Sequence, residues 1–354
     1  MNARMTTGAW RGVIDAYRSW LPALEGVVTL HEGATPLLPS TRLSHRLGRP
    51  VWLKIEGSNP TGSFKDRGMT VAVSRAAGDG ARGVICASTG NTAASAAAYA
   101  ARAGLRCVIV LPAGAVARGK LVQAVVHGAL VVAIDGGFEA ALDLARAGAQ
   151  ACGLVLVNSL NPLRLEGQTT AAFEICDALG RAPGTLVLPV GNGGNITAYW
   201  MGFCRYHEGG RTAGRPRLIG VQAEGANPLV AGAPVERPQT VASAIRIGRP
   251  ANWDGAARAA AASGGRFIQA SDAEITGAQR ALAADGIFVE PASAAAVAGA
   301  IRLDPAELAD GDLVCVLTGH GLKDPNAVPS AEPVGIPATL DALRAVIEGG
   351  KPWA

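Results

Sequence analysis

Residues 58–69 read SNPTGSFKDRGM, and the expected fold follows outward from this stretch. Ser63 followed three residues later by Asp66 is the pattern of a helix capping box, so a helix should begin here. Apolar residues then recur at helical spacing, at Met69, Ala72, Val73 and Ala76. Lys65 therefore falls in the first turn of a predicted helix.

A lysine in the first turn of a helix has an unusual electrostatic environment. The unpaired N–H groups there carry partial positive charge, and Arg67 adds a cation two residues on, so both disfavour the ammonium form of Lys65. Its amine should be more nucleophilic at neutral pH than that of an ordinary lysine. The alternative is a solvated surface lysine near a helix start.

Composition indicates a globular protein large enough for two domains. The chain has 354 residues, of which 49% are hydrophobic, and its mean hydropathy is +0.23. The net charge is only +4 and aromatic residues make up 5%, so no nucleic-acid-binding surface is expected. The 46 glycines suit an α/β protein that binds phosphate through main-chain N–H groups.

Cysteine spacing and the N-terminal sequence bear on the compartment. The cysteines are far apart in the sequence and form no CxxC pair, so neither a metal site nor a disulfide is predicted. We expect them to be small buried residues of a protein in a reducing compartment. They are Cys86, Cys107, Cys152, Cys176, Cys204 and Cys315. No signal-peptide core or 18-residue apolar run is present. We expect a cytoplasmic protein without membrane contact.

Short apolar runs alternate with helical patterns along the chain. The runs are VWLKIE, GVICAS, RCVIVLP, LVVAIDG and LVLVNS, then TLVLPVG, RLIGVQAE, RFIQAS and DLVCVLTG. This alternation predicts an α/β fold with two open, mostly parallel twisted sheets flanked by helices. We expect a large domain from residues 1–57 and 163–354 and an inserted small domain from 58–162. Further helices are expected near 13–20, 163–179 and 339–348, while 226–265 are not assigned.

Four loops at predicted strand ends carry polar residues suited to anions or a ring nitrogen. STGNT at 88–92 and GNGGN at 191–195 each precede a helix, where N–H groups can bind a carboxylate or phosphate. NSLNPLR at 158–164 offers amide, hydroxyl and guanidinium donors, and TGHGLKD at 318–324 begins with the hydroxyl of Thr318. Simple helix capping is the alternative for STGNT and for NSLNPLR.

One cofactor accounts for all of these groups. An activated lysine, a glycine loop for one phosphate, a hydroxyl for a ring nitrogen and a carboxylate loop are what pyridoxal 5'-phosphate requires, an electron sink held as a lysine Schiff base. GNGGN is weak evidence alone, but the chain has neither the GK[ST] of a nucleoside-triphosphate loop nor a GxGxxG fingerprint.

The order of these motifs resembles the tryptophan-synthase-like family of pyridoxal-phosphate enzymes, fold type II. The likeness runs from about residue 33 to 325, through EGATPLLP, EGSNPTGSFKDRGM, ASTGNTAASAAAYAARAG, NSLNPLRLEGQ, PVGNGGNITAYW, EPASAAA and LTGHGLKDP. It implies a cofactor lying between the large and small domains and a homodimeric assembly.

The resemblance also implies roles for particular residues. Lys65 would form the Schiff base, Asn91 would bond the cofactor's ring oxygen, and Thr318 would face its ring nitrogen. The cofactor phosphate would be held by Gly191, Asn192, Gly193, Gly194 and Asn195. The substrate carboxylate would be bound by Ser88, Thr89, Asn91 and Thr92, and a substrate phosphate by Thr92, Asn158, Ser159, Arg164 and Asn192.

Within the family, the motifs are closest to the branch that converts O-phospho-L-homoserine and water to L-threonine and phosphate. We therefore expect a lyase of threonine biosynthesis in which Lys65 moves protons as general base and acid. Threonine or serine dehydratases share the SFK and glycine loops but typically have His-Ala where Thr92 and Ala93 stand here, and they lack NSLNPLR. A nucleotide-binding regulatory module of the same fold is the alternative from a different class.

Overall fold

The larger of two sheets has six strands. The computed structural model describes residues 9–113, 118–327 and 333–349. The strand order is β1-β2-β10-β7-β8-β9, and all neighbours are parallel except β1, which is antiparallel to β2. The strands are β1 (Leu37–Pro39), β2 (Val51–Ile55), β7 (Thr185–Pro189), β8 (Arg217–Ala223), β9 (Arg266–Ala270) and β10 (Leu313–Leu317).

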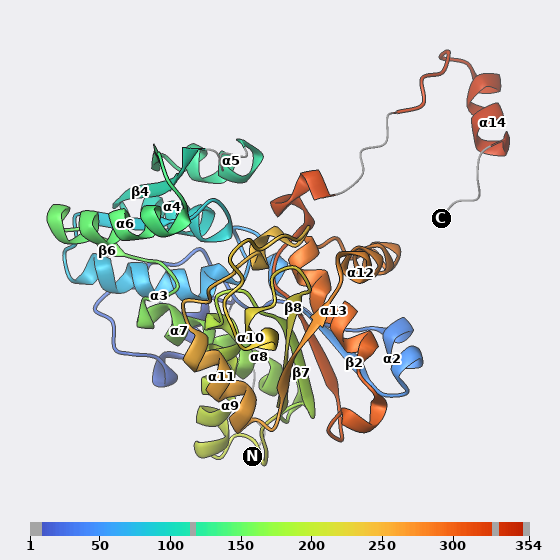
Figure 1. Cartoon of the computed structure of the whole chain (residues 1–354), viewed down its shortest axis with the longest axis horizontal. Coiled ribbons are helices and arrows are strands. Elements are labelled where there is room, and N and C mark those ends of the chain that lie inside the picture. Colours follow the sequence, from blue (N-terminus) through green and yellow to red (C-terminus); the bar gives the residue numbers. More distant parts are fainter. Residues whose placement is uncertain (1–8, 114–117, 328–332, 350–354) are drawn as a thin grey trace.

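A second, four-stranded sheet is wholly parallel. Its order is β5-β4-β3-β6, and its strands are β3 (Gly83–Ala87), β4 (Arg106–Pro112), β5 (Leu130–Ile134) and β6 (Val155–Leu156). Figure 1 shows this sheet and its helices as one side of the molecule. The predicted α/β fold with two mostly parallel sheets is confirmed, and the strand VWLKIE pairs with β10 in the larger sheet.

Helices cover both sheets. Those associated with the smaller sheet are α3 (Lys65–Gly78), α4 (Asn91–Ala103), α5 (Arg118–Val126) and α6 (Phe138–Cys152). Those that follow along the chain are α7 (Pro162–Gln168), α8 (Thr170–Leu179), α9 (Gly194–Glu208), α10 (Pro228–Ala231), α11 (Trp253–Ala262), α12 (Asp272–Ala284) and α13 (Pro291–Arg302). The remaining α-helices are α1 (Val13–Ala16), α2 (Thr41–Leu47) and α14 (Leu340–Gly349).

Several predicted helices differ in detail from those observed. The helix expected over 163–179 is two helices, because α7 ends at Gln168 and α8 begins at Thr170. The helix near 13–20 is only α1 followed by the 3-10 turn η1 (Arg18–Trp20). The unassigned residues 226–265 contain α10, the 3-10 turn η4 (Ser243–Ile245) and α11. No helix in the described ranges is long and apolar enough to cross a bilayer.

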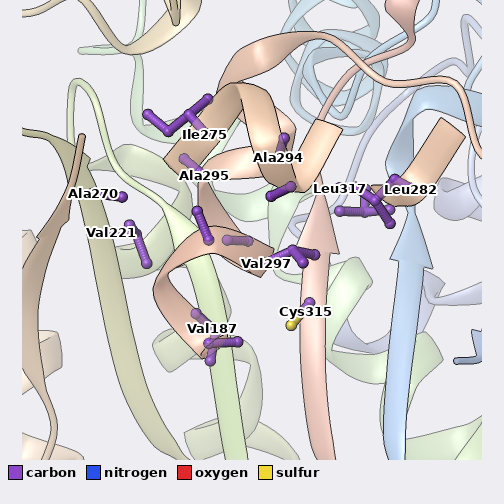
Figure 2. Packing of buried hydrophobic residues seen from close by; sticks show 14 of the residues in the cluster. Val187, Val221, Ala270, Ile275, Leu282, Ala294, Ala295, Val297, Cys315 and Leu317 are labelled. Atoms are coloured by element: carbon purple, nitrogen blue, oxygen red, sulfur yellow. The ribbon is translucent and has the colours of Figure 1, made fainter. Parts of the chain in front are cut away.

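On one face of the larger sheet, helix α13 packs largely through short side chains. The central strand β10 is buried at every position, and the alanine-rich helix α13 lies against it with residues 291–300 all buried. Figure 2 shows Ala294, Ala295 and Val297 of α13 packed among residues of the sheet, including Val187 and Cys315. Small side chains let α13 pack against β7 and β10, the strands that precede two of the expected site loops.

The cysteines only partly match expectation. All are free; Cys86, Cys107, Cys176 and Cys315 are buried, but Cys152 is exposed and Cys204 is partly exposed.

The carboxyl ends of parallel strands lie at one edge of a sheet. The residues that follow β2, β7 and β10 therefore meet at one edge of the larger sheet, and those that follow β3 and β6 meet at one edge of the smaller sheet.

Candidate active site

Lys65 lies beside the end of β10. The Phe64 N–H donates to the Thr318 carbonyl (3.0 Å), and Ser63 forms a β-bridge with Gly319. Lys65 is the first residue of α3, and its Nζ stands 4.4 Å from the centre of the Phe64 ring. The lysine and Thr318, which are far apart in sequence, are therefore neighbours at the edge of the larger sheet.

The ammonium form of Lys65 is disfavoured, as the sequence predicted, but for different reasons. Burial is the main cause that lowers the pKa of Lys65 to about 7; the positive charge of Arg164 acts in the same direction, and Glu290 opposes both. The prediction that Arg67 supplies the neighbouring cation is wrong. Its charge is neutralised within its own ion pairs, whereas Arg164 has no such partner among the described residues.

The predicted capping box at the start of α3 is also wrong. The N-cap is Phe64, and no side chain caps the helix. The Asp66 carboxylate instead accepts hydrogen bonds from the Thr61 N–H (2.7 Å), the Thr61 hydroxyl (2.6 Å) and the Ser95 hydroxyl (2.6 Å). Burial raises the pKa of Asp66 to about 6 despite these bonds, and they tie α3 to α4 and to the preceding loop.

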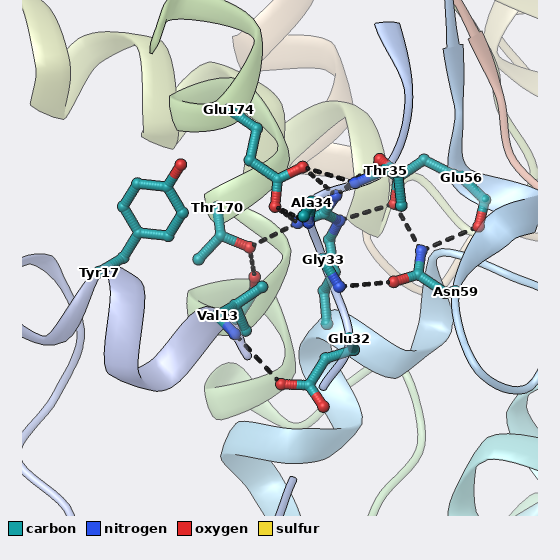
Figure 3. Close-up of polar contacts among 12 residues, drawn as sticks. Val13, Tyr17, Glu32, Gly33, Ala34, Thr35, Glu56, Asn59, Thr170 and Glu174 are labelled. Atoms are coloured by element: carbon teal, nitrogen blue, oxygen red, sulfur yellow. Dashed lines mark hydrogen bonds and ion pairs between the residues drawn. The ribbon is translucent and has the colours of Figure 1, made fainter. Parts of the chain in front are cut away.

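Arg67 is fully buried in a polar network that joins α3 to α8 and to the end of β2. Its guanidinium makes 2.7 Å ion pairs with both Glu56 and Glu174, and Lys54 also pairs with Glu174 at 2.7 Å. Figure 3 shows Glu174, Thr35, Glu56 and Asn59 of this network converging. Two buried cations face two buried carboxylates, so the charges balance, and the network fixes the helix that begins with Lys65.

Arg164 on α7 is buried without a counter-charge in the described chain. The residue is 0% exposed; Nη1 donates to the Val157 carbonyl (3.0 Å), and Nε and Nη2 have no partner. Burial lowers the pKa of Arg164 to about 10. The backbones of α3 and α7 lie in close contact at Gly167: a Cβ there would be only 1.9 Å from the Arg67 carbonyl oxygen. This contact sets the position of Arg164 relative to Lys65.

The loop after β3 offers main-chain donors. Within the described chain the N–H groups of Thr89, Asn91 and Thr92 donate no hydrogen bond, and Ser88 uses its hydroxyl to accept from Gly90 and Ala93. The side chains of Ser88, Thr89, Asn91 and Thr92 are partly exposed. Free N–H groups at the start of α4 suit a carboxylate.

Asn158 holds this loop in place. Its side-chain amide donates to the Ala87 carbonyl and accepts from the Ala87 N–H, both at 2.9 Å, so it pairs with the end of β3 like one more strand residue. Ser159 is partly exposed beside it. The loop expected to bind a substrate phosphate is thus joined to the loop expected to bind its carboxylate.

The glycine loop after β7 forms a cradle of unpaired N–H groups. Within the described chain, residues 191–195 donate no main-chain hydrogen bond, and the α9 N-terminus at Gly194 has no side-chain cap. Gly193 takes a left-handed conformation with φ 81°, and a Cβ there would lie 2.7 Å from the Asn252 carbonyl oxygen. A Cβ on Gly194 would touch Leu165, which places the loop beside α7.

Asn252 supports the glycine loop, a role that the sequence did not predict. The Asn252 N–H donates to the Asn192 carbonyl (2.9 Å), and its side-chain amide donates to the Thr197 hydroxyl (2.8 Å). The Ala251 N–H donates to the Asn192 side chain (3.2 Å). Asn252 lies in the stretch IGRPANW at 247–253, within the residues left unassigned from the sequence, and nothing local indicates which loop it contacts. Arg249 of the same motif is exposed.

Thr318 is buried next to Ser293 on α13, another residue without a predicted role. The two hydroxyls are 3.2 Å apart, and Ser293 also bonds the Gly319 N–H (2.7 Å) and carbonyl (3.0 Å). Nearby, the Asn91 amide donates to the Glu290 carboxylate at 3.1 and 3.3 Å. Both Ser293 and Glu290 belong to the motif EPASAAA, so their position in a specific motif was the available signal.

A cavity of about 450 Å³ opens beside Asn91. His320 and Lys323, from the loop after β10, line it together with Thr61 and Gln123. Lys323 Nζ donates to the Thr61 carbonyl (3.1 Å) and to the Gln123 side chain, and burial lowers the pKa of Lys323. No cluster of metal-ligating side chains occurs in the described ranges.

The residues fit a phosphate-bearing pyridine cofactor. In the described chain, six buried side-chain polar atoms have no partner, and four of them lie on segments that adjoin Lys65 or the glycine loop: Ser63 Oγ, Asn195 Nδ2 and two Arg164 nitrogens. The other two are Arg49 Nε and the Tyr199 hydroxyl oxygen. Such atoms are costly unless a ligand bonds them. Together with the free N–H groups of 191–195, they form a donor set for anionic groups around one nucleophilic lysine.

Comparisons with known proteins agree with this donor set. A family model described as pyridoxal-phosphate dependent enzyme matches residues 28–319. The threonine synthase of Halalkalibacterium halodurans is 51% identical over 354 residues, covering 97% of this chain and 99% of that protein. The threonine synthase of Synechocystis sp. is 56% identical over 322 residues, covering 90% of this chain and 84% of that protein.

Solved structures share the fold. The crystal structure of a T.th. threonine deaminase superposes with a TM-score of 0.70 at 26% identity, covering 84% of this chain and 94% of that one. Maize serine racemase also gives a TM-score of 0.70, at 21% identity over 89% of this chain and 92% of that one, which shows the fold alone. The chain belongs to the pyridoxal-phosphate dependent enzymes and, among them, to the family of the threonine synthases.

Proposed function

We propose that the chain converts O-phospho-L-homoserine and water to L-threonine and phosphate, with pyridoxal 5'-phosphate as cofactor. The observation that carries this proposal is the buried, uncompensated guanidinium of Arg164 in the described chain, whose charge acts on the low-pKa amine of Lys65. A receptor for an anion beside a nucleophilic amine suits an amino acid that bears a phosphate. The relatives of about half identity over nearly the whole chain are threonine synthases, which supports the same reaction.

The residues that would hold the cofactor are those expected from the sequence. Lys65 would carry it as a Schiff base, the N–H groups of residues 191–195 would bind its phosphate, Thr318 would face its ring nitrogen, and Asn91 would donate to its ring oxygen. When bound, the cofactor supplies an electron sink for charge that develops on the substrate carbons.

The chain's own groups would then orient the substrate and move protons. The N–H groups of Thr89, Asn91 and Thr92 would bind the substrate carboxylate, and Arg164 with Ser159, Asn158 and Asn192 would surround its phosphate. Lys65 Nζ, with a pKa of about 7, is part amine and part ammonium near neutral pH. It can therefore take protons from Cα and then from Cβ, so that phosphate leaves from Cγ. It can then return a proton to Cγ and, after water has added at Cβ, one to Cα.

We further propose that residues 58–162 form a small domain inserted into a large one made of 1–57 and 163–354, with the cofactor between them. Support comes from the smaller sheet, whose strands all lie within residues 83–156. The Arg67 network ties the start of α3 to Glu56 and Glu174 of the large domain, so Lys65 lies at the boundary between the two proposed domains, and domain closure there would exclude water from the site. By family resemblance we also propose a homodimer; free cysteines accord with a cytoplasmic location.

The deciding experiment is phosphate release from O-phospho-L-homoserine by the purified, yellow holoenzyme, with the amino-acid product identified by NMR. We expect equal amounts of phosphate and L-threonine. If the enzyme instead forms ammonia and a 2-oxo acid from threonine or serine and leaves phosphohomoserine intact, a dehydratase becomes the correct assignment. A colourless protein that binds a nucleotide would remove the pyridoxal phosphate proposal altogether.

A further inference from the structure

Glu290 is a buried carboxylate whose position its own helix does not explain. It is the N-cap residue of α13, yet its side chain makes no capping hydrogen bond. Only 3% of the residue is exposed. A carboxylate is costly to bury unless charged or polar partners compensate it, so the groups that Glu290 faces indicate its purpose.

One of these groups is the Asn91 amide. Asn91 Nδ2 donates to Glu290 Oε1 (3.1 Å) and Oε2 (3.3 Å), across 199 positions of sequence. An asparagine amide nitrogen carries two hydrogens, and the one that Glu290 engages fixes the plane of the amide. The second hydrogen of Asn91 is then aimed in a set direction, available for an oxygen of a bound ligand.

The second group is the Lys65 nitrogen, because Gly319, beside which the Glu290 carboxylate lies, forms a β-bridge with Ser63, two residues before Lys65. Burial and the charge of Arg164 lower the pKa of Lys65, and Glu290 is the group that raises it. Glu290 also acts in the same sense on Lys323, from the loop after β10, whose pKa burial lowers. Among the described residues, the charged groups on which this carboxylate acts include Lys65 on α3 and Lys323 on η6 (Gly321–Lys323).

The chain is shaped to admit the Glu290 carboxylate. A Cβ on Gly319 would lie 2.3 Å from Glu290 Oε1, and the Glu290 N–H donates to the Gly319 carbonyl (3.2 Å). Gly319 directly follows Thr318, the residue expected to face the cofactor's ring nitrogen. The Glu290 carboxylate therefore lies next to the expected cofactor site. Only a residue without a side chain leaves that space.

We propose that Glu290 is a positioning residue of the cofactor site, which orients the Asn91 amide toward the cofactor's ring oxygen and places a negative charge opposite the Lys65 nitrogen. This role rests on the proposed use of pyridoxal 5'-phosphate. Glu290 acts through Asn91 and Lys65 and is distinct from the groups assigned to the substrate. A purely structural tie between α4 and α13 would require only its hydrogen bond to Asn91.

The test separates charge from hydrogen bonding. Glu290→Gln keeps an oxygen acceptor for Asn91 and removes the charge, and the readout is the pH midpoint of the visible absorbance change of the holoenzyme. Losing a nearby anion disfavours the protonated nitrogen, so we expect the midpoint to fall by about one unit, a tenfold change in the protonation equilibrium. In the cofactor-free full chain, acetylation of Lys65 can be measured by mass spectrometry as a function of pH. The pH of half-maximal acetylation should also be lower in Glu290→Gln than in the wild type.

The matched control is Asp312→Asn. Asp312 is also 3% exposed, but it precedes β10 at the opposite end from Thr318 and pairs with Arg181. Its neutralisation should leave the absorbance midpoint unchanged. A midpoint shift of equal size in this control would overturn the inference, because burial of any carboxylate would then account for the effect.

Gly319→Ala is a second variant that retains Glu290 and displaces its carboxylate. Its midpoint should fall as well, and it decides the question alone if Glu290→Gln does not bind the cofactor. If Glu290→Gln and Gly319→Ala both keep the absorbance midpoint of the wild type, the inference is overturned, even when the wild-type enzyme releases phosphate as proposed. A coloured wild-type enzyme that releases no phosphate from O-phospho-L-homoserine would instead refute the proposed reaction and leave the Glu290 measurement readable.

Discussion

Replacing Arg164 with leucine tests whether its buried charge serves a ligand or the fold. Arg164 is 0% exposed, and its only side-chain hydrogen bond in the described chain is the 3.0 Å contact from Nη1 to the Val157 carbonyl. A buried cation without a counter-charge destabilises the chain that carries it. Its presence is understandable if an anionic ligand pairs with Nε and Nη2.

The size of the kinetic effect follows from those two unpaired nitrogens. Hydrogen bonds to charged groups contribute about 1.5–3 kcal/mol each, so two to a substrate phosphate contribute roughly 3–6 kcal/mol. At about 1.4 kcal/mol per factor of ten, Arg164→Leu should lower kcat/KM for O-phospho-L-homoserine by on the order of a hundredfold to ten-thousandfold. The absorbance spectrum of the bound cofactor should persist.

The stability effect should be small, which distinguishes this arginine from a structural one. Leucine removes an unpaired charge but leaves the Val157 carbonyl without a donor, at a cost of about 1–3 kcal/mol, and these effects oppose each other. We expect urea unfolding of the cofactor-free chain to change by no more than about 2 kcal/mol. The matched control is Arg205→Leu, which breaks the ion pair with Glu166 of α7 and should leave kcat/KM nearly intact.

Two results would refute this reasoning. If Arg164→Leu lost stability and kept its kinetics, Arg164 would serve only its own helix. If activity fell equally on phosphorylated and unphosphorylated amino acids, NSLNPLR would not be the phosphate loop, and a dehydratase would be the better assignment.

Three further predictions concern the lysine and its support. Lys65→Ala should abolish turnover and the lysine-linked visible band while far-ultraviolet circular dichroism stays unchanged; a band that survives dialysis would exclude Lys65 as the Schiff-base residue. In the cofactor-free chain Lys65 acetylation should be half-maximal near pH 7, because the pKa is lowered to about 7 and the reactive amine gains population as pH rises through it; a midpoint near the ordinary lysine value of about 10 would contradict the burial argument. Glu174→Gln leaves the cations of Lys54 and Arg67 under-compensated and should lower the free energy of unfolding by about 3–5 kcal/mol in urea titration, whereas an unchanged midpoint would show that the network does not stabilise the fold.

Local sequence patterns were enough to predict the fold class and the positions of the loops at the site. The nine apolar runs named in the sequence are β2 to β10, and each expected anion loop follows a strand, because strand length, glycine punctuation and helical spacing are encoded within short stretches. The motif order further indicated the cofactor. Parallel pairing then brings the strand ends together at one edge, so even the neighbourhood of Lys65, Thr318 and the glycine loop could be anticipated.

Long-range pairing decided what those motifs do. Ser63 and Asp66 have the spacing of a capping box, yet Asp66 bonds Ser95, 29 positions away, because tertiary donors compete with the local backbone. The sequence predicted that the charge of Arg67 acts on Lys65. In the structure Arg67 pairs instead with Glu174, which is 107 positions away in the sequence. Burial, which no spacing reveals, lowers the pKa of Lys65 and leaves Arg164 uncompensated in the described chain. The partners of a charged side chain are set by packing of distant segments, so only the tertiary structure could assign them.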